Sequence, residues 1–425
     1  MSDPLDYQSV SIDHGRRGCT RTGSVPSDPG PGWLDPYNAL RMAPHANRIR
    51  VELDRAELDD LAARLSRTRL SRSDTSSWER GTPTPWLAEL IAEWRAFDPS
   101  RLQDTLDQLT HIEVILDGLS IHAVHAPGSS ARAAPLLLTH GWPSSFLEYM
   151  TLLPLLTNPS LEMGSPHLAF SVVAPSLPGF GFSGAPPEGG LTHGEVAEIW
   201  HRLMVDVFGY ERYFAHGSDL GAGVTARLAR AHPGAVAAVH LATPGLDAPP
   251  EPWSAPVRRY VDDVAQWSSA EGGYSHMHST KPSTVAAALL DSPVGLAAWI
   301  GEKWMRWSAT TERGHPAVSR EHLLSTLTLY WVTRTAGSSL LPYWNFQHSR
   351  HSALPADDPA PTPTAIDIFG GEPVSFPKPP RDLAQRYFNV VNWAEHDSGG
   401  HFPAVAEPRL LAECLHRAFG PYQVA

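Results

Sequence analysis

The stretch HGSDLGAG, residues 216–223, decides the fold that this sequence predicts. It follows the apolar run RYFAH (212–216) and leads into a segment with the apolar spacing of a helix, so Asp219 lies at a predicted strand-to-helix turn. Gly217 and Gly221, two residues to either side, suit the tight backbone on which enzymes present a nucleophile. The sequence therefore predicts a carboxylate nucleophile at this turn. The alternative is that Asp219 only caps the helix that follows.

Before this turn, predicted strands and helices follow one another. Residues 49–70 have the pattern of a strand followed by an amphipathic helix, and residues 84–97 have that of a second helix. Residues 111–127 predict two strands joined by an Asp-Gly turn. Residues 136–143 and 168–181 each begin with a short apolar run, typical of strands buried on both faces of a sheet.

The alternation continues around and beyond the turn. Residues 191–210 begin with a capping box and carry one apolar stripe, which predicts a helix. Residues 235–245 predict a strand, and about 247–351 is helical and rich in tryptophan. The proline-rich run 354–365 is interpreted as a linker that leads out of this helical insertion. A last strand at NVVNW and a closing helix near 408–419 complete the series.

These patterns predict one fold class and five parts of the chain. Alternating strands and helices imply an α/β fold, a parallel sheet with helices on both faces, interrupted by the helical insertion. The predicted parts are a disordered arm, an N-terminal region that wraps the core, the first part of the core, a helical lid and the second part of the core, at 1–40, 41–110, 111–246, 247–353 and 354–425.

Composition argues against several classes of function. Forty-five acidic against 33 basic residues give a net charge of −12, which disfavours nucleic-acid binding. Cys19 and Cys414, the two cysteines, form neither a disulfide framework nor a metal-ligand spacing, and no glycine-rich dinucleotide motif occurs. The chain has no run of about 18 apolar residues and no signal-peptide pattern. The sequence therefore predicts a cytoplasmic protein without a membrane span, a metal or a cofactor.

Two further segments lie where a nucleophile at position 219 would need them. HGWP (140–143) ends a predicted strand, so the amides of Trp142 and Leu220 are candidate donors to an oxyanion. His401, in SGGHF, follows the last predicted strand and comes after Asp219 in the chain, which is the order expected of a nucleophile and its base. The alternative for His401 is a histidine of a surface loop.

Six segments together resemble one known family. They are IRVELDRAELDDLAARL (49–65), HGWPSSFLEY (140–149), APSLPGFGFS (174–183), GSDLG (217–221), GGYSHMHSTKPSTVAAALLDSPVGLAAWIGEKW (272–304) and GGHFPAVAEP (399–408). In these segments the chain is similar to the epoxide hydrolases of the microsomal-like branch of the α/β-hydrolase superfamily. The resemblance implies an α/β-hydrolase fold, with a mostly parallel eight-stranded sheet, helices on both faces, a helical lid and an N-terminal accessory region.

The resemblance also implies roles for individual residues. Asp219 would attack an epoxide carbon and form an alkyl ester that water can cleave, whereas a serine would form a stable ether. Tyr274 and Tyr343 in the lid would donate hydrogen bonds to the departing oxygen. His401 would then activate water against the ester, whose carbonyl is held by the two candidate oxyanion donors. The alternative for each tyrosine is a buried core residue.

The substrate is expected to be a small-molecule epoxide, apolar or aromatic. His140, Trp307 and Trp344 are predicted to line its pocket, while most other tryptophans of the insertion belong to the core of the lid. A homodimer is compatible with the sequence but is not required by it.

One part of the family pattern is missing. The family places the acid that orients the histidine two residues after Phe-Pro, but the phrase here is FPKP (376–379), without an acid. Asp247, which follows a predicted strand, or no acid at all is the favoured interpretation. Asp382 lies just beyond the shortened loop. Glu372 is predicted to precede the strand and to point to the wrong end of the sheet.

This departure leaves more than one function open. The first is an epoxide hydrolase that makes a vicinal diol with a relocated acid. The second is a cyclase or coupling enzyme of secondary metabolism, in which the tyrosines activate an epoxide and a nucleophile other than water completes the reaction. A dehalogenase would need halide-binding donors in place of the tyrosines, and a binding protein without catalysis is the remaining alternative.

Overall fold

The computed structural model of the chain describes residues 46–72, 76–164, 167–311, 314–349 and 353–422. The arm predicted at residues 1–40 lies outside the described residues.

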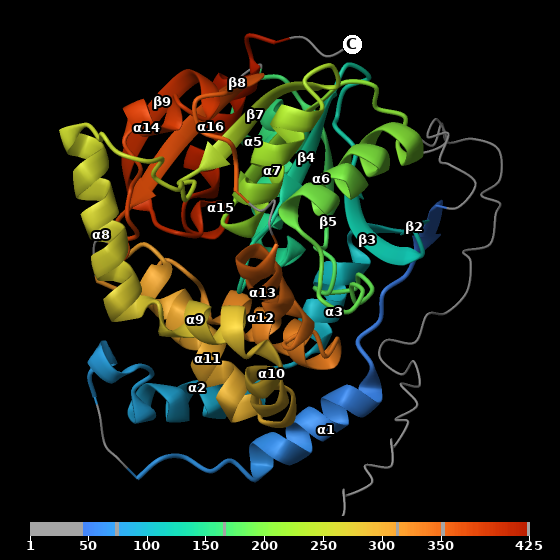
Figure 1. Cartoon of the computed structure of the whole chain (residues 1–425). Helices are drawn as coiled ribbons and strands as arrows, with labels where there is room; N and C mark the ends of the chain where they lie inside the picture. Colours follow the sequence, from blue (N-terminus) through green and yellow to red (C-terminus); the bar gives the residue numbers. More distant parts are fainter. Residues whose placement is uncertain (1–45, 73–75, 165–166, 312–313, 350–352, 423–425) are drawn as a thin grey trace, which may run out of the picture.

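A nine-stranded sheet forms the centre of the described chain (Figure 1). In spatial order its strands are β1 (Ala46–Ile49), β2 (Thr110–Leu116), β3 (Leu119–Ala126), β5 (Phe170–Pro175), β4 (Ala134–Thr139), β6 (Tyr213–Ser218), β7 (Val236–Ala242), β8 (Ala360–Gly370) and β9 (Phe388–Gly399). Neighbouring strands are antiparallel from β1 to β5 and parallel from β5 to β9. The predicted fold class is confirmed, with one strand more than expected because β1 pairs with β2 at the edge.

The predicted hairpin is formed by β2 and β3. Asp117 and Gly118 occupy its turn with φ angles of 51° and 77°. Positive φ at both central residues is the requirement of a type I′ turn, for which Asp-Gly is well suited. The register places Leu116 opposite Leu119, so the two-residue loop was correctly predicted.

Helices cover both faces of the sheet, as predicted. α6 (His193–Arg202) and α7 (Leu220–Ala231) pack together, and α7 lies against β4, β6, β7 and β8. α4 (Leu152–Thr157) and α16 (Pro408–Phe419) pack on β5, β7 and β8. The capping box of α6 is present, with Thr192 and Glu195 each accepting from the other's backbone amide. The helix continues through a π-turn, Leu203–Val207, towards Gly209, whose φ is 72°.

The insertion between β7 and β8 is helical, and the N-terminal helices pack against it (Figure 1). Its helices are α8 (Ala255–Glu271), α9 (Gly273–Thr280), α10 (Pro282–Asp291), α11 (Pro293–Trp307), α12 (Arg320–Val332) and α13 (Leu341–His348). The N-terminal helices are α1 (Arg55–Ser66), α2 (Thr84–Ala96) and α3 (Ser100–Asp107). α1 contacts α11 and α12, and α2 contacts α11. The insertion therefore lies between the sheet and helices α1 and α2.

Short helices complete the described elements. They are η1 (Trp78–Arg80), η2 (Phe146–Tyr149), α5 (Pro159–Glu162), η4 (Ser338–Leu340), α14 (Arg381–Ala384) and α15 (Pro403–Ala406). Of these, η2 and α15 matter for the site, because they pack against each other at the edge where the parallel strands end.

The proline-rich run 354–365 was predicted to be a linker, and its second half is instead the start of β8. Irregular pairing between β8 and β9 near Ala360 and Pro363 accommodates residues that lack an amide donor. The Thr362 hydroxyl donates to the carbonyl of Ala229 on α7, which anchors this part of the strand. The prolines therefore mark the irregular end of a strand rather than a segment without structure.

In the described part of the chain, no single helix has the length and hydropathy of a membrane span. α10 and α11 reach those values only when they are taken together, and the chain bends by 116° between them.

Candidate active site

The backbone at Asp219 adopts a conformation that L residues rarely use, with φ of 50° and ψ of −123°. The tight turn between β6 and α7 imposes it. A Cβ atom on Gly217 would lie 2.1 Å from the carbonyl oxygen of Gly221, and one on Gly221 would lie 1.9 Å from that of Thr139. Both positions therefore require glycine, and the strained turn presents the Asp219 side chain where the parallel strands end.

Backbone amides hold one oxygen of the Asp219 carboxylate. Oδ1 accepts a hydrogen bond of 2.9 Å from the Trp142 amide, and the Leu220 amide also stabilises the carboxylate. Gly141 leaves room for it, because a Cβ there would lie 2.4 Å from Oδ1. Burial opposes ionisation, but these amides and His401 outweigh that effect and hold the pKa of Asp219 below its ordinary value. An ionised carboxylate thus occupies the predicted oxyanion site.

His401 faces the other oxygen of Asp219. Its Nε2 lies 3.3 Å from Oδ2, and the two side chains are only 12% and 20% exposed. The imidazole stacks on the ring of Phe376, with centroids 4.5 Å apart, and meets Trp307 at 5.1 Å. The backbone amide of His401 donates to the Trp307 carbonyl. The structure therefore brings Asp219 and His401 together, and it fixes the imidazole between aromatic rings.

Two tyrosines of the insertion lie beside Trp142. Tyr274, on α9, stacks parallel to the Trp142 indole with ring centroids 5.3 Å apart. Tyr343, on α13, meets the rings of Trp142 and Tyr274 edge-on, at 5.9 and 6.0 Å. The ammonium of Lys303 lies 4.6 Å from the centroid of Tyr274. The two predicted tyrosines therefore lie together next to the loop that supplies an oxyanion donor.

Both phenols keep their protons. Burial raises the pKa of Tyr274 and of Tyr343, and the negative charge of Asp219 raises both further. The Tyr343 hydroxyl is buried and interacts with the Tyr274 hydroxyl, but it forms no hydrogen bond of standard geometry in the described part of the chain. A buried donor without a well-formed hydrogen bond is costly in a folded protein. This pair of phenols therefore offers an O–H group that a bound oxygen atom would satisfy.

Asp247, the favoured substitute for the missing acid, has an exposed side chain. Its charge acts on Arg227, Tyr260 and Tyr387, and its backbone carbonyl accepts from the Tyr387 hydroxyl. Within the described residues it forms no hydrogen bond or ion pair with His401. The geometry therefore gives no support to the prediction that Asp247 orients His401.

The predicted position of Glu372 was wrong, because β8 ends at Gly370 and Glu372 follows it at the edge where His401 lies. Its Oε1 accepts from the Phe376 amide, and its Oε2 is buried without a partner in the described chain. Asp382, the third candidate, accepts a hydrogen bond of 2.5 Å from the Ser254 hydroxyl at the start of α8. The misplaced strand boundary at the proline-rich run caused the error for Glu372.

The three predicted pocket residues have different surroundings. His140 is fully buried, and its two ring nitrogens contact the Gly141 carbonyl and the Leu177 amide, so it fixes the backbone of two loops rather than facing a ligand. Trp344 stacks on His348 within α13, with centroids 3.7 Å apart. Trp307 is buried and contacts both His401 and Tyr274. Of the three, Trp307 is the one that packs against the site.

Glu148, on η2, was not singled out from the sequence. It is 3% exposed, and burial raises its pKa to about 7. The charges of His401 and Asp219 both act on it. No sequence pattern marks this residue, because it is one glutamate between apolar neighbours, and its closeness to His401 arises only in the folded chain.

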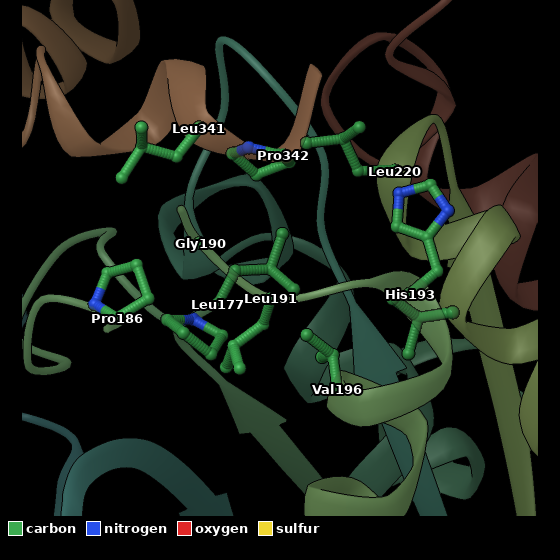
Figure 2. A pocket seen from close by; sticks show the side chains of 11 residues that line it. Leu177, Pro186, Gly190, Leu191, His193, Val196, Leu220, Leu341 and Pro342 are labelled. Carbon is green, nitrogen blue, oxygen red and sulfur yellow. The ribbon is translucent and has the colours of Figure 1, made fainter. Parts of the chain in front are cut away.

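An apolar pocket opens beside Leu220, between the core and α13 (Figure 2). Its lining is predominantly aliphatic and includes Leu177, Pro186, Leu191, Val196, Leu341 and Pro342. His193 lies next to Leu220 at one end of the pocket, and both of its ring nitrogens are buried without a partner in the described chain. Burial lowers the pKa of His193 to about 3, so its imidazole is neutral.

One group of metal-ligand residue types occurs among the described residues. The ligand atoms of Asp367, His396 and Cys414 lie within 4.8 Å of one another. Asp367 already accepts hydrogen bonds from His240, His396 and Arg417, and Arg417 also contacts the sulfur of Cys414. A guanidinium occupies the place that a cation would take, so this group is a buried hydrogen-bond network under the sheet edge.

Known proteins are similar to this chain. Residues 46–149 match the family described as "Epoxide hydrolase N terminus", and residues 134–270 match "alpha/beta hydrolase fold". The chain is 38% identical to a protein of Stigmatella aurantiaca (strain DW4/3-1) that carries the name "Putative epoxide hydrolase", over 87% of this chain and 84% of that one. It is 30% identical to Epoxide hydrolase 1 of Oryctolagus cuniculus, over 88% of each chain.

A solved structure agrees with these relatives. The juvenile hormone epoxide hydrolase of the silkworm Bombyx mori superposes with a TM-score of 0.78 at 27% identity, covering 91% of this chain and 96% of that one. The strand-to-helix turn at Asp219, the tyrosine-bearing helical insertion and these similarities lead to one conclusion: the chain belongs to the epoxide hydrolase family of the α/β-hydrolase fold.

Proposed function

We propose that this protein hydrolyses an epoxide to a vicinal diol through an alkyl ester on Asp219. In the first half-reaction, Oδ2 attacks one carbon of the three-membered ring. A carbon–oxygen bond forms to Asp219, the ring carbon–oxygen bond breaks, and Tyr274 and Tyr343 donate hydrogen bonds to the oxygen that departs. The buried Tyr343 hydroxyl, which lies beside Tyr274 and forms no hydrogen bond of standard geometry in the described chain, is the observation that carries this step.

In the second half-reaction, water attacks the carbonyl carbon of the ester and His401 Nε2 takes its proton. The negative charge develops on Oδ1, which is bound to the Trp142 and Leu220 amides even in the resting site. Collapse of this intermediate breaks the ester bond to the alkyl group. The released alkoxide takes the proton from His401. The proton left on the Asp219 carboxyl group passes to the alkoxide formed in the first half-reaction, so the diol leaves and the carboxylate is restored with one oxygen from water.

We assign the orienting acid of this mechanism to Glu372. It follows β8 and lies between Asp219 and His401 in the chain, which is the order nucleophile, acid, base that enzymes of this fold use. Its Oε2 is buried and unpartnered among the described residues, and its Oε1 holds the amide of Phe376, whose ring stacks on His401. A rotation of the Glu372 side chain would let Oε2 accept a hydrogen bond from the imidazole of His401, which the ring of Phe376 in the same loop already contacts.

The pocket in Figure 2 indicates the substrate class. Aliphatic side chains surround the space beside Leu220, so an apolar substituent on the epoxide gains free energy by leaving water there. His193, a neutral imidazole at one end, offers a hydrogen bond to a single polar group on that substituent. We therefore propose an apolar epoxide as substrate, with at most one polar group on the chain that enters this pocket.

Single turnover in ¹⁸O-labelled water tests the proposed function. Enzyme in excess over an apolar epoxide such as styrene oxide should yield unlabelled diol, with the label found in the peptide that contains Asp219. Asp219→Asn is the control and should form no ester. Label that appears directly in the diol, or an adduct other than a diol, would contradict the ester route and favour a different nucleophile.

A further inference from the structure

One buried carboxyl group lies close to the place where water must react. Glu148 is on η2, and η2 packs against α15, which begins two residues after His401. The Thr151 hydroxyl, just beyond η2, also points to the carbonyl of Ala404 on α15. The electrostatic effect of both His401 and Asp219 on Glu148 agrees with this placement. Glu148 therefore belongs to the wall of the same site, although it lies far from both residues in sequence.

Two polar atoms of this wall lack a hydrogen bond of standard geometry. Oε1 of Glu148 and Nε2 of His401 are both buried without such a bond in the parts of the chain that are described, although the Ser144 and Tyr149 side chains act on the Glu148 carboxyl group. The 3.3 Å contact between His401 and Asp219 lacks the alignment of a hydrogen bond. Buried polar groups nearly always have a partner in folded proteins. An acceptor oxygen and a ring nitrogen at one site would both be satisfied by a single water molecule.

Two other side chains of this wall are committed elsewhere. The Tyr330 hydroxyl donates to the Ser144 carbonyl, and the Trp304 indole donates to that of Pro143. The Trp304 ring stacks on Phe402 at 3.9 Å, which closes this side of the site to solvent. Tyr330 and Trp304 therefore do not bind Oε1 of Glu148, which forms no hydrogen bond of standard geometry in the described residues.

We propose that Glu148 is a positioning residue for ester hydrolysis, binding the attacking water together with His401 and stabilising the imidazolium that forms. This inference rests on the proposed function. Water donates one hydrogen bond to Glu148 and its other proton to His401 Nε2 as its oxygen bonds to the ester carbon. Glu148 takes up no proton in this step, so its carboxylate form offsets the positive charge on His401 while that charge exists. Attack on the epoxide does not involve water and does not need Glu148.

The two half-reactions provide the test. In Glu148→Gln, rapid-quench mass spectrometry with styrene oxide should show ester formation at the wild-type rate and ester decay slowed by about 10²-fold, the scale of lost proton-transfer assistance. Glu148→Asp keeps the charge but shortens the side chain, so it should decay faster than Glu148→Gln and form ester normally. If Glu148→Gln does not fold, the rates of ester formation and decay in Glu148→Asp test the inference instead.

Glu57→Gln is the matched control, because Glu57 is also buried but pairs with Arg334 between α1 and α12. It should leave ester decay unchanged relative to ester formation. The inference is overturned if both Glu148 variants hydrolyse the ester as fast as wild type, or if formation falls as much as decay. If wild-type enzyme forms diol without an ester on Asp219, the proposed function itself fails, which is a separate result.

Discussion

The Trp142 indole and the Tyr274 ring are stacked, with an angle of 8° between their planes and their centroids 5.3 Å apart. Trp142 belongs to the loop after β4 and supplies an amide to Asp219, whereas Tyr274 belongs to the insertion. One aromatic stack therefore sets the position of the Tyr274 phenol relative to the amide that holds Asp219. The two halves of the site are aligned by packing, which stacked rings favour by about 0.5–1.5 kcal/mol beyond the burial of their area.

Removal of a phenol hydroxyl should slow only the opening of the epoxide. Tyr274→Phe and Tyr343→Phe should each reduce the rate of ester formation by about 10²-fold, the cost of one lost donor to a developing oxyanion. Ester decay should change little, and rapid-quench measurement of both steps checks this. Tyr260→Phe is the control, since its hydroxyl is bound to the Leu246 backbone. Equal effects on both steps would contradict the assignment.

Replacement of His401 should stop the reaction after the first half-reaction, when the ester has formed. In His401→Gln, Asp219 retains its amide donors and should still attack the epoxide. Without a proton acceptor, the ester should accumulate to one equivalent per enzyme, which intact-protein mass spectrometry detects. Wild-type rates of diol release from this variant would show that another group activates water.

The glycine before Trp142 should be essential for the carboxylate. In Gly141→Ala, the new Cβ would lie 2.4 Å from both Cβ and Oδ1 of Asp219, so one of the two must move. A displaced nucleophile should lower kcat/KM by about 10²-fold or more, because an error of about 1 Å at a reacting group costs that much. Gly234→Ala, which meets no atom within 4 Å, should retain full activity.

The buried network at Asp367 should matter for stability over a defined pH range. Burial opposes its ionisation, but hydrogen bonds from His240 and His396 and the charge of Arg417 outweigh it and lower the pKa of Asp367. The contribution of ionised Asp367 to the free energy of unfolding is therefore present above the ordinary carboxyl pKa of 3.8. It is lost as the pH falls towards the lower pKa that Asp367 has in the folded protein. Asp367→Asn should cost about 3 kcal/mol in urea unfolding at pH 7. The difference from wild type should shrink at pH 3, and a constant difference would contradict this reasoning.

Glu148 should have the opposite effect on stability. Burial raises its pKa from 4.5 to about 7 and is only partly offset by hydrogen bonds with Ser144 and Tyr149 and by the charge of His401, so the free energy of unfolding should fall as the pH rises through that range. Asp219 is the other titratable group that acts on it, and its charge raises the pKa further. Glu148→Gln removes the buried charge and should raise stability at pH 8 relative to pH 5 by up to about 3 kcal/mol. Urea unfolding at both pH values measures this, and no gain would show that the carboxylate is well solvated.

Much of the fold could be predicted because its signals are local. The Asp-Gly hairpin, the capping box at Thr192 and the glycines around Asp219 each combine a residue type with a backbone requirement that the structure shows. The strand β8 was misplaced because prolines 361 and 363 are typical of a linker, while their tolerance in the strand depends on pairing with β9. That boundary also determined the interpretation of Glu372.

The rest of the site depends on tertiary contacts that leave no local pattern. The ring stack on His401 and the approach of Glu148 join segments more than 20 residues apart, and neither has a characteristic spacing. His140 is the opposite case, because its sequence position predicted a role in the pocket that the folded chain does not show. Its place in HGWP suggested a ligand contact, whereas its nitrogens serve the backbone of Gly141 and Leu177. Residue type and sequence position predicted the kind of chemistry. The folded chain is needed to distinguish a side chain that could react from one that holds the backbone in place.

The N-terminal segment has a consequence for how molecules reach Asp219. It continues the sheet through β1 at one edge and covers the insertion through α1 and α2, so the same segment contacts both the sheet and the insertion. Contacts on both sides favour an insertion that stays in place over one that opens as a hinged flap. If the protein acts on epoxides as proposed, entry and exit would then depend on side chains at the mouth of the apolar pocket, and the width of that aperture would select among substrates before any bond is made or broken.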